Sequence, residues 1–269
     1  MRGKLAWPVG GSEGTFPRLP SRIDAIFTEK YMHKIETEIL LDKESPLLSA
    51  ETSNGGVHPK LKSDLDLYII SCAKALTTII SSTEKTKLSL SLLDVSHVEL
   101  FSETGQSDEA YIEMLVENCI IRVQSIYDRT LIFVNRILDL GISNESISHN
   151  IMVTNEHVKK FKLDEKLKNI NKACNGYRLI RNTVIHHGRH SEDQLDKLNL
   201  IISADRLSKE VGKGSFIKPE ELRIIKKSYL ETKREELGIY LGNIEEKLFQ
   251  LYDSILPIYT YQKDKLRAR

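Results

Sequence analysis

The sequence has few cysteines, no excess of charge of one sign and no long hydrophobic run, and each lack excludes a class of protein. The three cysteines, Cys72, Cys119 and Cys174, are far apart among 269 residues. An odd, dispersed set argues against a disulfide framework and favours reduced thiols in a cytoplasmic protein. Lysine plus arginine totals 39 and aspartate plus glutamate 38, so the net charge is +1. We therefore expect any polyanionic partner to be held by a local patch.

Motifs for membranes, export and nucleotide hydrolysis are also lacking. No apolar run approaches the ~20 residues that a membrane span needs. The opening residues, MRGKLAWPVGGSEGTFPRLP, have no hydrophobic stretch like that of a signal peptide. The "GKG" at Gly212 does not extend to the G-x-x-x-x-G-K-[ST] pattern of phosphate-binding loops. We expect no membrane partner, no cofactor and no ATP hydrolysis.

The hydrophobic spacing predicts an all-α protein, an antiparallel helical bundle with long connections. Alternating strands with hairpin turns and repeats of fixed length are lacking. Helical spacing covers 21–39, Leu61–Ser82, Asp108–Leu140, Asp164–Gly188 and Pro219–Leu256, the last with a bend near Gly238. A short helix follows Ser191, Thr83–Gln106 is expected to be an irregular connection, and Ile202–Lys218 is unassigned.

Three regions follow from this pattern. Residues 1–20, rich in glycine and proline, are expected to form a loosely ordered arm. Residues 21–107 would supply N-terminal helices that pack on the bundle. Residues 108–261 would form the helical core. Its clearest helix begins after Ser107 with acidic residues in the first turn and stops before Gly141.

The stretch YRLIRNTVIHHGRH, from Tyr177 to His190, concentrates positive charge. It holds three arginines and three histidines without a carboxylate, and the acid-free run reaches back to Lys166. On a helix, Asn182 and His186 share a face, whereas Arg181 and His186 lie roughly 140° apart. A histidine in the last turn is stabilised as imidazolium by the helix dipole, which suits a general acid or base.

The segment Arg181-Asn182-Thr183-Val184-Ile185-His186 resembles the R-polar-x3-H motif of the HEPN superfamily. Its place at the end of a long helix in an all-α chain matches the setting of that motif, and the chain is most similar to stand-alone bacterial HEPN proteins. The resemblance implies a metal-independent endoribonuclease that works as a homodimer, with two motif helices meeting in a composite cleft. It also suggests a toxin–antitoxin or phage-defence role, with an antitoxin or another partner protein.

The resemblance gives the residues roles in cutting RNA through its own 2′-hydroxyl. Two copies of His186 would act as base and acid, Arg181 would stabilise the phosphorane, and Asn182 would orient His186 or the phosphate. The remaining basic and aromatic residues are candidate substrate contacts: Tyr177, Arg178, His187, Arg189 and His190. For Tyr177, packing in the core is slightly favoured over stacking on a base.

Two further interpretations stay open. Arg122, Arg129 and Arg136 are spaced by seven, with Asp128 beside them, and this stripe either faces the motif helix, with Asp128 pairing with Arg181 or His186, or is solvated. His186, His187 and His190, with Glu192 or Asp193, would alternatively make a metal site, but Gly188 interrupts the helix and no glutamate lies between the histidines as in H-E-x-x-H. A HEPN fold without catalysis, acting as a nucleic-acid or nucleotide-binding or interaction module, is the alternative function.

Overall fold

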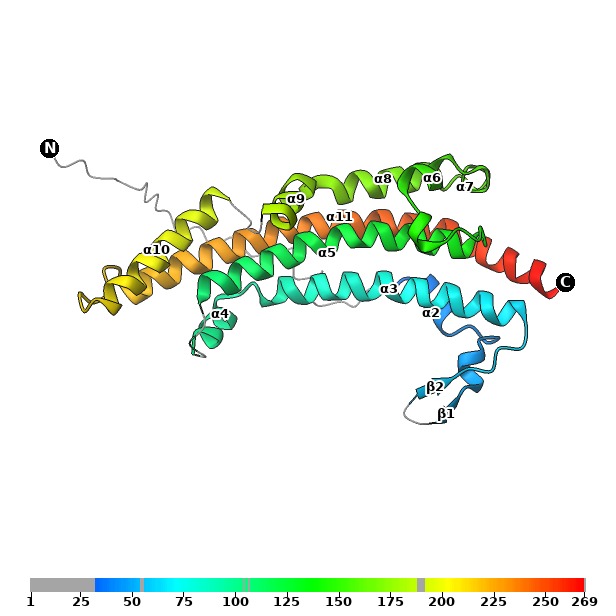
Figure 1. The fold of residues 1–269 in the computed structure, drawn as a ribbon, viewed down its shortest axis with the longest axis horizontal. Coiled ribbons are helices and arrows are strands. Elements are labelled where there is room, and N and C mark those ends of the chain that lie inside the picture. The colour runs from blue at the N-terminus through cyan, green and yellow to red at the C-terminus, as the bar shows by residue number, and fades with distance from the viewer. Residues whose placement is uncertain (1–31, 54–55, 104, 106, 188–191, 269) are drawn as a thin grey trace, which may run out of the picture.

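A computed structural model describes residues 32–53, 56–103, 105, 107–187 and 192–268. The predicted all-α class is confirmed, and most of the described chain is helical (Figure 1). The helices are α2 (Lys34–Leu40), α3 (Asp64–Leu92), α4 (Val95–Ser102), α5 (Asp108–Ile137), α6 (His149–Thr154), α7 (Glu156–Lys160), α8 (Asp164–Cys174), α9 (Arg178–His187), α10 (Asp193–Glu210) and α11 (Pro219–Arg267). Short 3₁₀ turns cover Pro46–Ser49, Asn144–Ser146 and Asn175–Tyr177.

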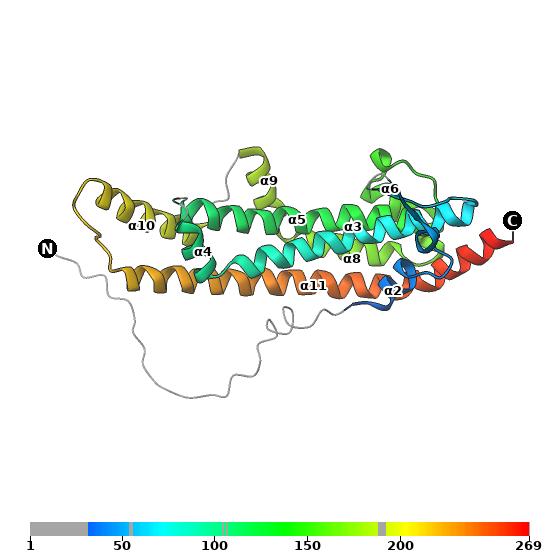
Figure 2. The same cartoon turned by 90° about the horizontal axis from the view of Figure 1, so that it is seen from below.

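Three long helices, α3, α5 and α11, and the shorter α8 lie side by side with alternating directions, which gives the antiparallel bundle (Figures 1 and 2). Their buried faces form one core, in which α5 contributes residues such as Ile120, Ile126 and Phe133. Burial of this apolar stripe on α5 against α3 and α11 is the main force that holds the bundle. The Tyr68 hydroxyl donates to the Ile137 carbonyl at 2.9 Å, tying α3 to the end of α5.

The expected irregular connection at Thr83–Gln106 is wrong, because α3 continues to Leu92 and α4 follows. The alternation of leucines with small polar residues resembled a strand, but Thr83 and Thr86 donate their hydroxyls to carbonyls one turn earlier, at Ile79 and Ser82. A threonine hydroxyl that donates to a carbonyl of its own helix can be buried without leaving an unsatisfied donor. Thr86 and Leu90 are accordingly buried against α5.

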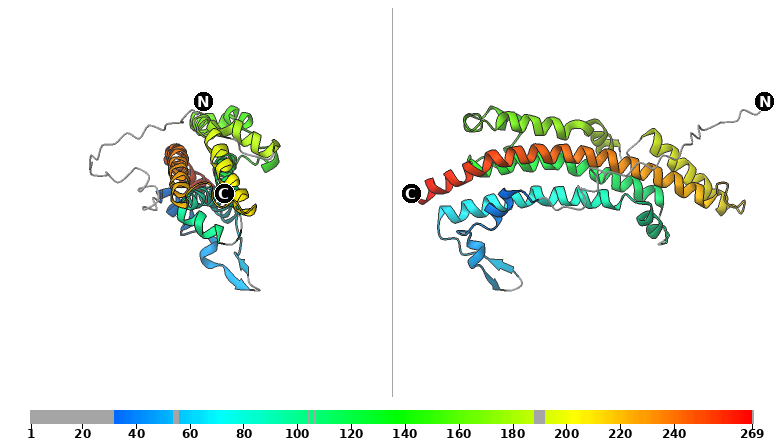
Figure 3. Two further views of the ribbon diagram at one scale, coloured as in Figure 1. Left: turned by 90° about the vertical axis from the view of Figure 1, so that its left-hand side faces the viewer. Right: turned by 180° about the vertical axis from the view of Figure 1, so that it is seen from behind.

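The region between α2 and α3 is a loop with more structure than expected. It contains an antiparallel hairpin, β1 (Glu51–Ser53) and β2 (Gly56–His58), which projects from the bundle (Figure 3). The expectation that no hairpin strands occur is therefore corrected for this short element. The predicted start of the first helix at Ser21 lies outside the described residues, as does the 1–20 arm; in the described part, His33 caps α2 by accepting from the Ile35 amide at 3.1 Å.

The last helix is longer than predicted, since α11 runs past Leu256 and includes Pro257 in its interior. A proline there removes one backbone hydrogen bond. The residues beyond it are nonetheless buried, among them Ile258, Tyr259 and Lys263, so packing holds the helix together. Figure 3 shows α11 as one continuous, gently curved helix.

A buried cluster fastens the C-terminal half of α11 to the loop after α2, and we call it the Lys263 cluster. Lys263 contacts Asp42 at 2.5 Å and Glu44 at 2.7 Å, and the Tyr259 hydroxyl donates to Asp42 at 2.7 Å. Burial opposes ionisation of Asp42, but hydrogen bonds from Lys263 and Tyr259 outweigh it, so the pKa of Asp42 lies below its usual value. Arg267, and then Lys263, lower the pKa of Glu44 to about 2.

One helix, α3, is long and apolar enough by composition to cross a membrane, which the sequence analysis did not single out. Half of its most apolar 18-residue window is buried within the protein. In the described chain α3 packs along α5 and begins with a Ser63 capping box. This is the environment of a core helix in a helical bundle.

Candidate functional site

The predicted motif lies on α9, a separate short helix. The single helix expected over Asp164–Gly188 is wrong, because α8 ends at Cys174 and a 3₁₀ turn, Asn175–Tyr177, precedes α9. Tyr240 of α11 explains the break: its hydroxyl donates to the Cys174 carbonyl at 2.6 Å, and its ring lies where a Cβ on Gly176 would come within 3.0 Å. Figure 2 shows α9 leaving the line of α8 and projecting from the bundle.

Arg181 and Asn182 are half-buried and bonded to each other. The Arg181 Nη1 donates to the Asn182 Oδ1 at 3.1 Å, and this contact fixes the orientation of the guanidinium. The Arg181 Nε is buried without a hydrogen-bond partner among the described residues. A planar guanidinium with a fixed orientation is suited to bind an anionic oxygen through those of its nitrogens that remain accessible.

Asp128, an exposed residue of α5, lies near Arg181. Partial desolvation raises the pKa of Asp128, and the guanidinium of Arg181, followed by that of Arg129, opposes the increase. Within the described part of the chain, Asp128 and Arg181 share no direct hydrogen bond or ion pair. The two side chains therefore interact through space, and pairing of Asp128 with Arg181 stays a prediction.

The arginine stripe of α5 divides into two parts. Arg136 donates to the Asn144 Oδ1 at 2.8 Å, next to the end of α5. Arg122 and Arg129 each have a buried Nε without a hydrogen-bond partner in the described structure. Arg129 also contributes to the field at Asp128. Two of the three arginines thus resemble Arg181 in having an unused donor, whereas Arg136 is engaged in the bundle.

The other predicted site residues have different surroundings. Arg178 is exposed at the start of α9, and Tyr177 packs edge-on against Tyr240 with ring centroids 4.8 Å apart. The side chains of His186 and His187, and all of Arg189 and His190, lie outside the described residues. Among the residues that are described, no group of three metal-ligating side chains comes together.

A family model described as Cthe2314-like HEPN matches residues 68–211, more than half of the chain and including α9. The chain belongs to the HEPN superfamily. No curated protein matches, and no solved structure does either. HEPN domains are all-α and act as nucleases or as nucleotide-binding modules, often binding nucleic acid as dimers, so the family places this chain in that broad class. The match starts within α3, and the proposed division of the chain at residue 107 stays a prediction.

The HEPN motif helix is bordered by a buried ion cluster that the sequence analysis missed, and we call it the Lys233 cluster. Lys233 of α11 is 4% exposed and contacts Glu192 at 2.6 Å and Glu236 at 2.7 Å. The Tyr177 hydroxyl donates to Glu236. Burial, and then this hydrogen bond, raise the pKa of Tyr177. No local sequence pattern identifies such a cluster, because its members are 41 and 59 residues apart.

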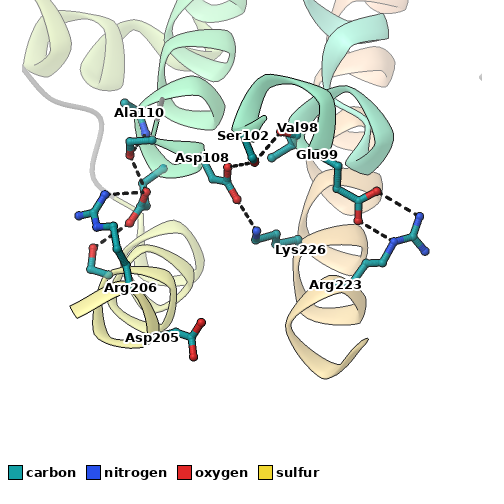
Figure 4. Close-up of polar contacts among 12 residues, drawn as sticks. Val98, Glu99, Ser102, Asp108, Ala110, Asp205, Arg206, Arg223 and Lys226 are labelled. Atoms are coloured by element: carbon teal, nitrogen blue, oxygen red, sulfur yellow. Dashed lines mark hydrogen bonds and ion pairs between the residues drawn. The ribbon is translucent and has the colours of Figure 1, made fainter. Parts of the chain in front are cut away.

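A second polar cluster lies around the first turn of α5 (Figure 4). Asp108 accepts from Lys226 of α11 and from Ser102 of α4, while Glu109 accepts from Ser203 of α10 at 2.9 Å. Arg223 of α11 binds Glu99 of α4 at 2.6 Å. This cluster is roughly 30 Å along α5 from Asp128, at 1.5 Å per residue. Its cations are paired with carboxylates, so it has a structural role in joining four helices.

Proposed function

We propose that this HEPN protein is a metal-independent endoribonuclease that acts as a homodimer, with Arg181, Asn182 and His186 as its catalytic residues. One observation carries the proposal: the Arg181 guanidinium is oriented by Asn182 and retains a buried donor, on a helix that projects from the bundle. A cation that is held in place and forms no ion pair with a carboxylate among the described residues can stabilise an anionic transition state. The R-N-x3-H spacing within a HEPN fold links that cation to His186.

The reaction follows from these groups. One His186 removes the proton from a 2′-hydroxyl, and the resulting oxygen attacks the adjacent phosphorus. The His186 of a second copy gives a proton to the departing 5′-oxygen, so that the chain breaks with a 2′,3′-cyclic phosphate on one fragment. Arg181 stabilises the negative charge of the phosphorane between these events. DNA lacks the 2′-hydroxyl and is not cut.

Exposed apolar residues on α5 and α9 support a dimer. Met114 and Ile121 are spaced by seven on α5 in line with Asp128, and they are 51% and 37% exposed. Leu179 of α9 is 82% exposed. Large apolar side chains gathered around polar residues mark protein interfaces. A two-fold axis through this face would bring two motif helices together.

Basic residues around the motif provide the binding surface for RNA in this proposal. Arg178 is exposed at the start of α9, and Arg122 and Arg129 have unused donors on α5. His187, Arg189 and His190 add positive charge by sequence. Tyr177 contributes by supporting the start of α9, and Asp128 supports Arg181. No cofactor or metal enters the reaction.

The cellular role proposed from the family is growth arrest in the cytoplasm, within a toxin–antitoxin or phage-defence system. An antitoxin or another partner protein would then restrain the cleavage. The basic strip from Lys166 to Ser191 offers an acidic partner the surface that RNA would use.

The test is cleavage of mixed RNA by the purified protein in the presence of EDTA. We expect products that end in a 2′,3′-cyclic phosphate, and a loss of about 10²–10³ in kcat for Arg181→Ala, by analogy with removal of one transition-state donor. His186→Ala should abolish cleavage. Arg223→Ala, which removes an arginine bound to Glu99 far from α9, is the matched control and should cleave at the wild-type rate.

Each part of the proposal can fail separately. Cleavage that is lost with chelator would replace the metal-free mechanism by the metal alternative. RNA binding without cleavage would leave the binding-module function. A strict monomer at micromolar concentration in light scattering would remove the composite cleft.

A further inference from the structure

Both ends of the stretch that carries the motif are fastened to the same part of α11. Tyr177 directly precedes α9, and Glu192 is the N-cap residue of α10. Tyr177 binds Glu236 through its hydroxyl, and Glu192 binds Lys233 at 2.6 Å. Lys233 and Glu236 are themselves joined at 2.7 Å, so the two attachments share one ion pair.

The attachments lie on one stripe of α11. Lys233, Glu236 and Tyr240 are at positions i, i+3 and i+7, which lie on the same face of a helix. Tyr240 adds the contacts described above: its hydroxyl holds the Cys174 carbonyl, and its ring packs against Tyr177 and Gly176. Two turns of α11 thus contact the chain immediately before α9 and immediately before α10.

The central charge of this arrangement is deeply buried. Lys233 is 4% exposed, although it is an ammonium group that ordinarily remains hydrated. It lies between two carboxylates, and without it Glu192 and Glu236 would repel each other at short range. Loss of Lys233 therefore releases both attachments together, whereas loss of Tyr177 would release only one.

We infer that Lys233 is a positioning residue for the HEPN motif, which sets the place of α9 by holding Glu192 and the Glu236–Tyr177 pair. The inference rests on the proposed function for its effect on cleavage, but not for its effect on α9. Lys233 does not touch the motif residues; it acts through the chain on either side of them. Small displacements of a catalytic group lower the rate more than they lower substrate binding.

The experiment compares Lys233→Met with Lys263→Met in the full chain. Both substitutions remove a buried ammonium group of α11 that binds two carboxylates, but only Lys233 is next to the motif. The first measurement is amide hydrogen exchange of α9, which needs no activity. The second is RNA cleavage, with kcat and KM determined separately, at a temperature where both variants are folded.

For Lys233→Met we expect exchange in α9 to rise about tenfold and kcat to fall about tenfold, with KM changed less than threefold. Lys233→Arg keeps the charge and should recover most of both losses. Lys263→Met should leave α9 exchange and kcat unchanged. If Lys233→Met does not fold, Glu236→Gln, which removes one charge and keeps a hydrogen-bond acceptor for Tyr177, gives the same readouts.

The experiment distinguishes failure of the positioning role from failure of the proposed function. Unchanged exchange in α9 of Lys233→Met overturns the positioning role, and so does an equal effect of Lys263→Met. Raised exchange in α9 combined with wild-type protein that does not cut RNA overturns the proposed function and leaves the attachment of α9 to Lys233 in place.

Discussion

The Lys233 and Lys263 clusters have the same arrangement of side chains at two places on α11, thirty residues apart. In each, a buried lysine lies between two carboxylates and a tyrosine hydroxyl donates to one of them. The difference is in the acids. In the Lys263 cluster the Asp42 side chain is 5% exposed and that of Glu44 is 38% exposed, whereas those of Glu192 and Glu236 are 25% and 46% exposed. The Lys263 cluster therefore has one acid in the core, and both acids of the Lys233 cluster lie at its edge.

The two clusters also differ in the tyrosine that donates its hydroxyl. Each lysine follows a tyrosine by four residues, Tyr229 before Lys233 and Tyr259 before Lys263. Tyr259 donates to Asp42, but the buried hydroxyl of Tyr229 has no hydrogen-bond partner in the described structure. In the Lys233 cluster the hydroxyl comes instead from Tyr177, at the entry to α9. One cluster thus joins α11 to the loop after α2, and the other joins it to the segment that carries the motif.

The largest loss of stability is expected for Lys263→Met. The substitution leaves Asp42 buried without its counter-ion, and breaking a buried pair in this way destabilises a protein by about 3–5 kcal/mol. Lys233→Met should cost clearly less, because Glu192 and Glu236 can regain water. Urea unfolding followed by circular dichroism measures both. Equal losses would mean that the exposure of the acids does not distinguish the clusters.

The next largest loss of stability is expected when a tyrosine hydroxyl is removed from either cluster. Tyr259→Phe removes a hydrogen bond to a buried carboxylate, for which about 1.5–3 kcal/mol is expected. Tyr177→Phe removes one to the half-exposed Glu236 and should cost less than about 1 kcal/mol. Thermal unfolding of the two variants side by side tests the difference, and a larger loss for Tyr177→Phe would reverse the assignment of core and edge.

A smaller effect is expected from acid on the Lys263 cluster. The pKa of Glu44 is lowered to about 2 from an ordinary value near 4.5, so its stabilisation is complete above that ordinary value and is lost as the pH falls through the folded value. Glu44→Gln should therefore flatten the decrease of the melting temperature between pH 4.5 and about 2. Since the Glu44 side chain is 38% exposed, solvent screening limits the effect. If the melting temperature of Glu44→Gln falls as steeply in acid as that of the wild-type protein, groups other than Glu44 cause the pH dependence.

The smallest effect is expected for a surface pair on the same helix. Lys227 approaches Glu231 at 3.8 Å, and both side chains are more than half exposed. Lys227→Met should change the free energy of unfolding by less than about 0.5 kcal/mol. This variant is the baseline for the methionine substitutions at Lys233 and Lys263. A loss comparable to theirs would show that methionine itself, and not the missing ion pair, destabilises α11.

The features of the fold that could be predicted from the sequence are those that depend on interactions between residues close together in the chain. The central helix α5 was predicted nearly to its ends, because Ser107, the acidic first turn and the apolar spacing are local signals. The last ten residues of α3, 83–92, were missed, since their leucines alternate with small polar residues as in a strand and their hydroxyls are satisfied only within the folded helix. The break between α8 and α9 was also missed, because it depends on Tyr240, 66 residues from Cys174.

The candidate site divides in the same way. The motif Arg181, Asn182 and His186 is a local pattern and was found by its spacing. The contacts that place it, at Lys233 and Glu236, come from a helix whose sequence reads as an ordinary charged surface. These contacts form only when α11 packs against the chain on both sides of α9, so the hydrophobic periodicity of α11 could not predict them.

The unbroken course of α11 places a constraint on its length. Between Lys233 and Lys263 there is no loop to absorb an inserted or deleted residue. At about 100° per residue, a single insertion would turn one lysine by more than a quarter of a circle relative to the other. An insertion of seven residues would keep the angle to within roughly 20° but shift the two clusters apart by about 10 Å. Changes of length in this protein should therefore be tolerated in the loop before Pro219 and not within the helix that follows it.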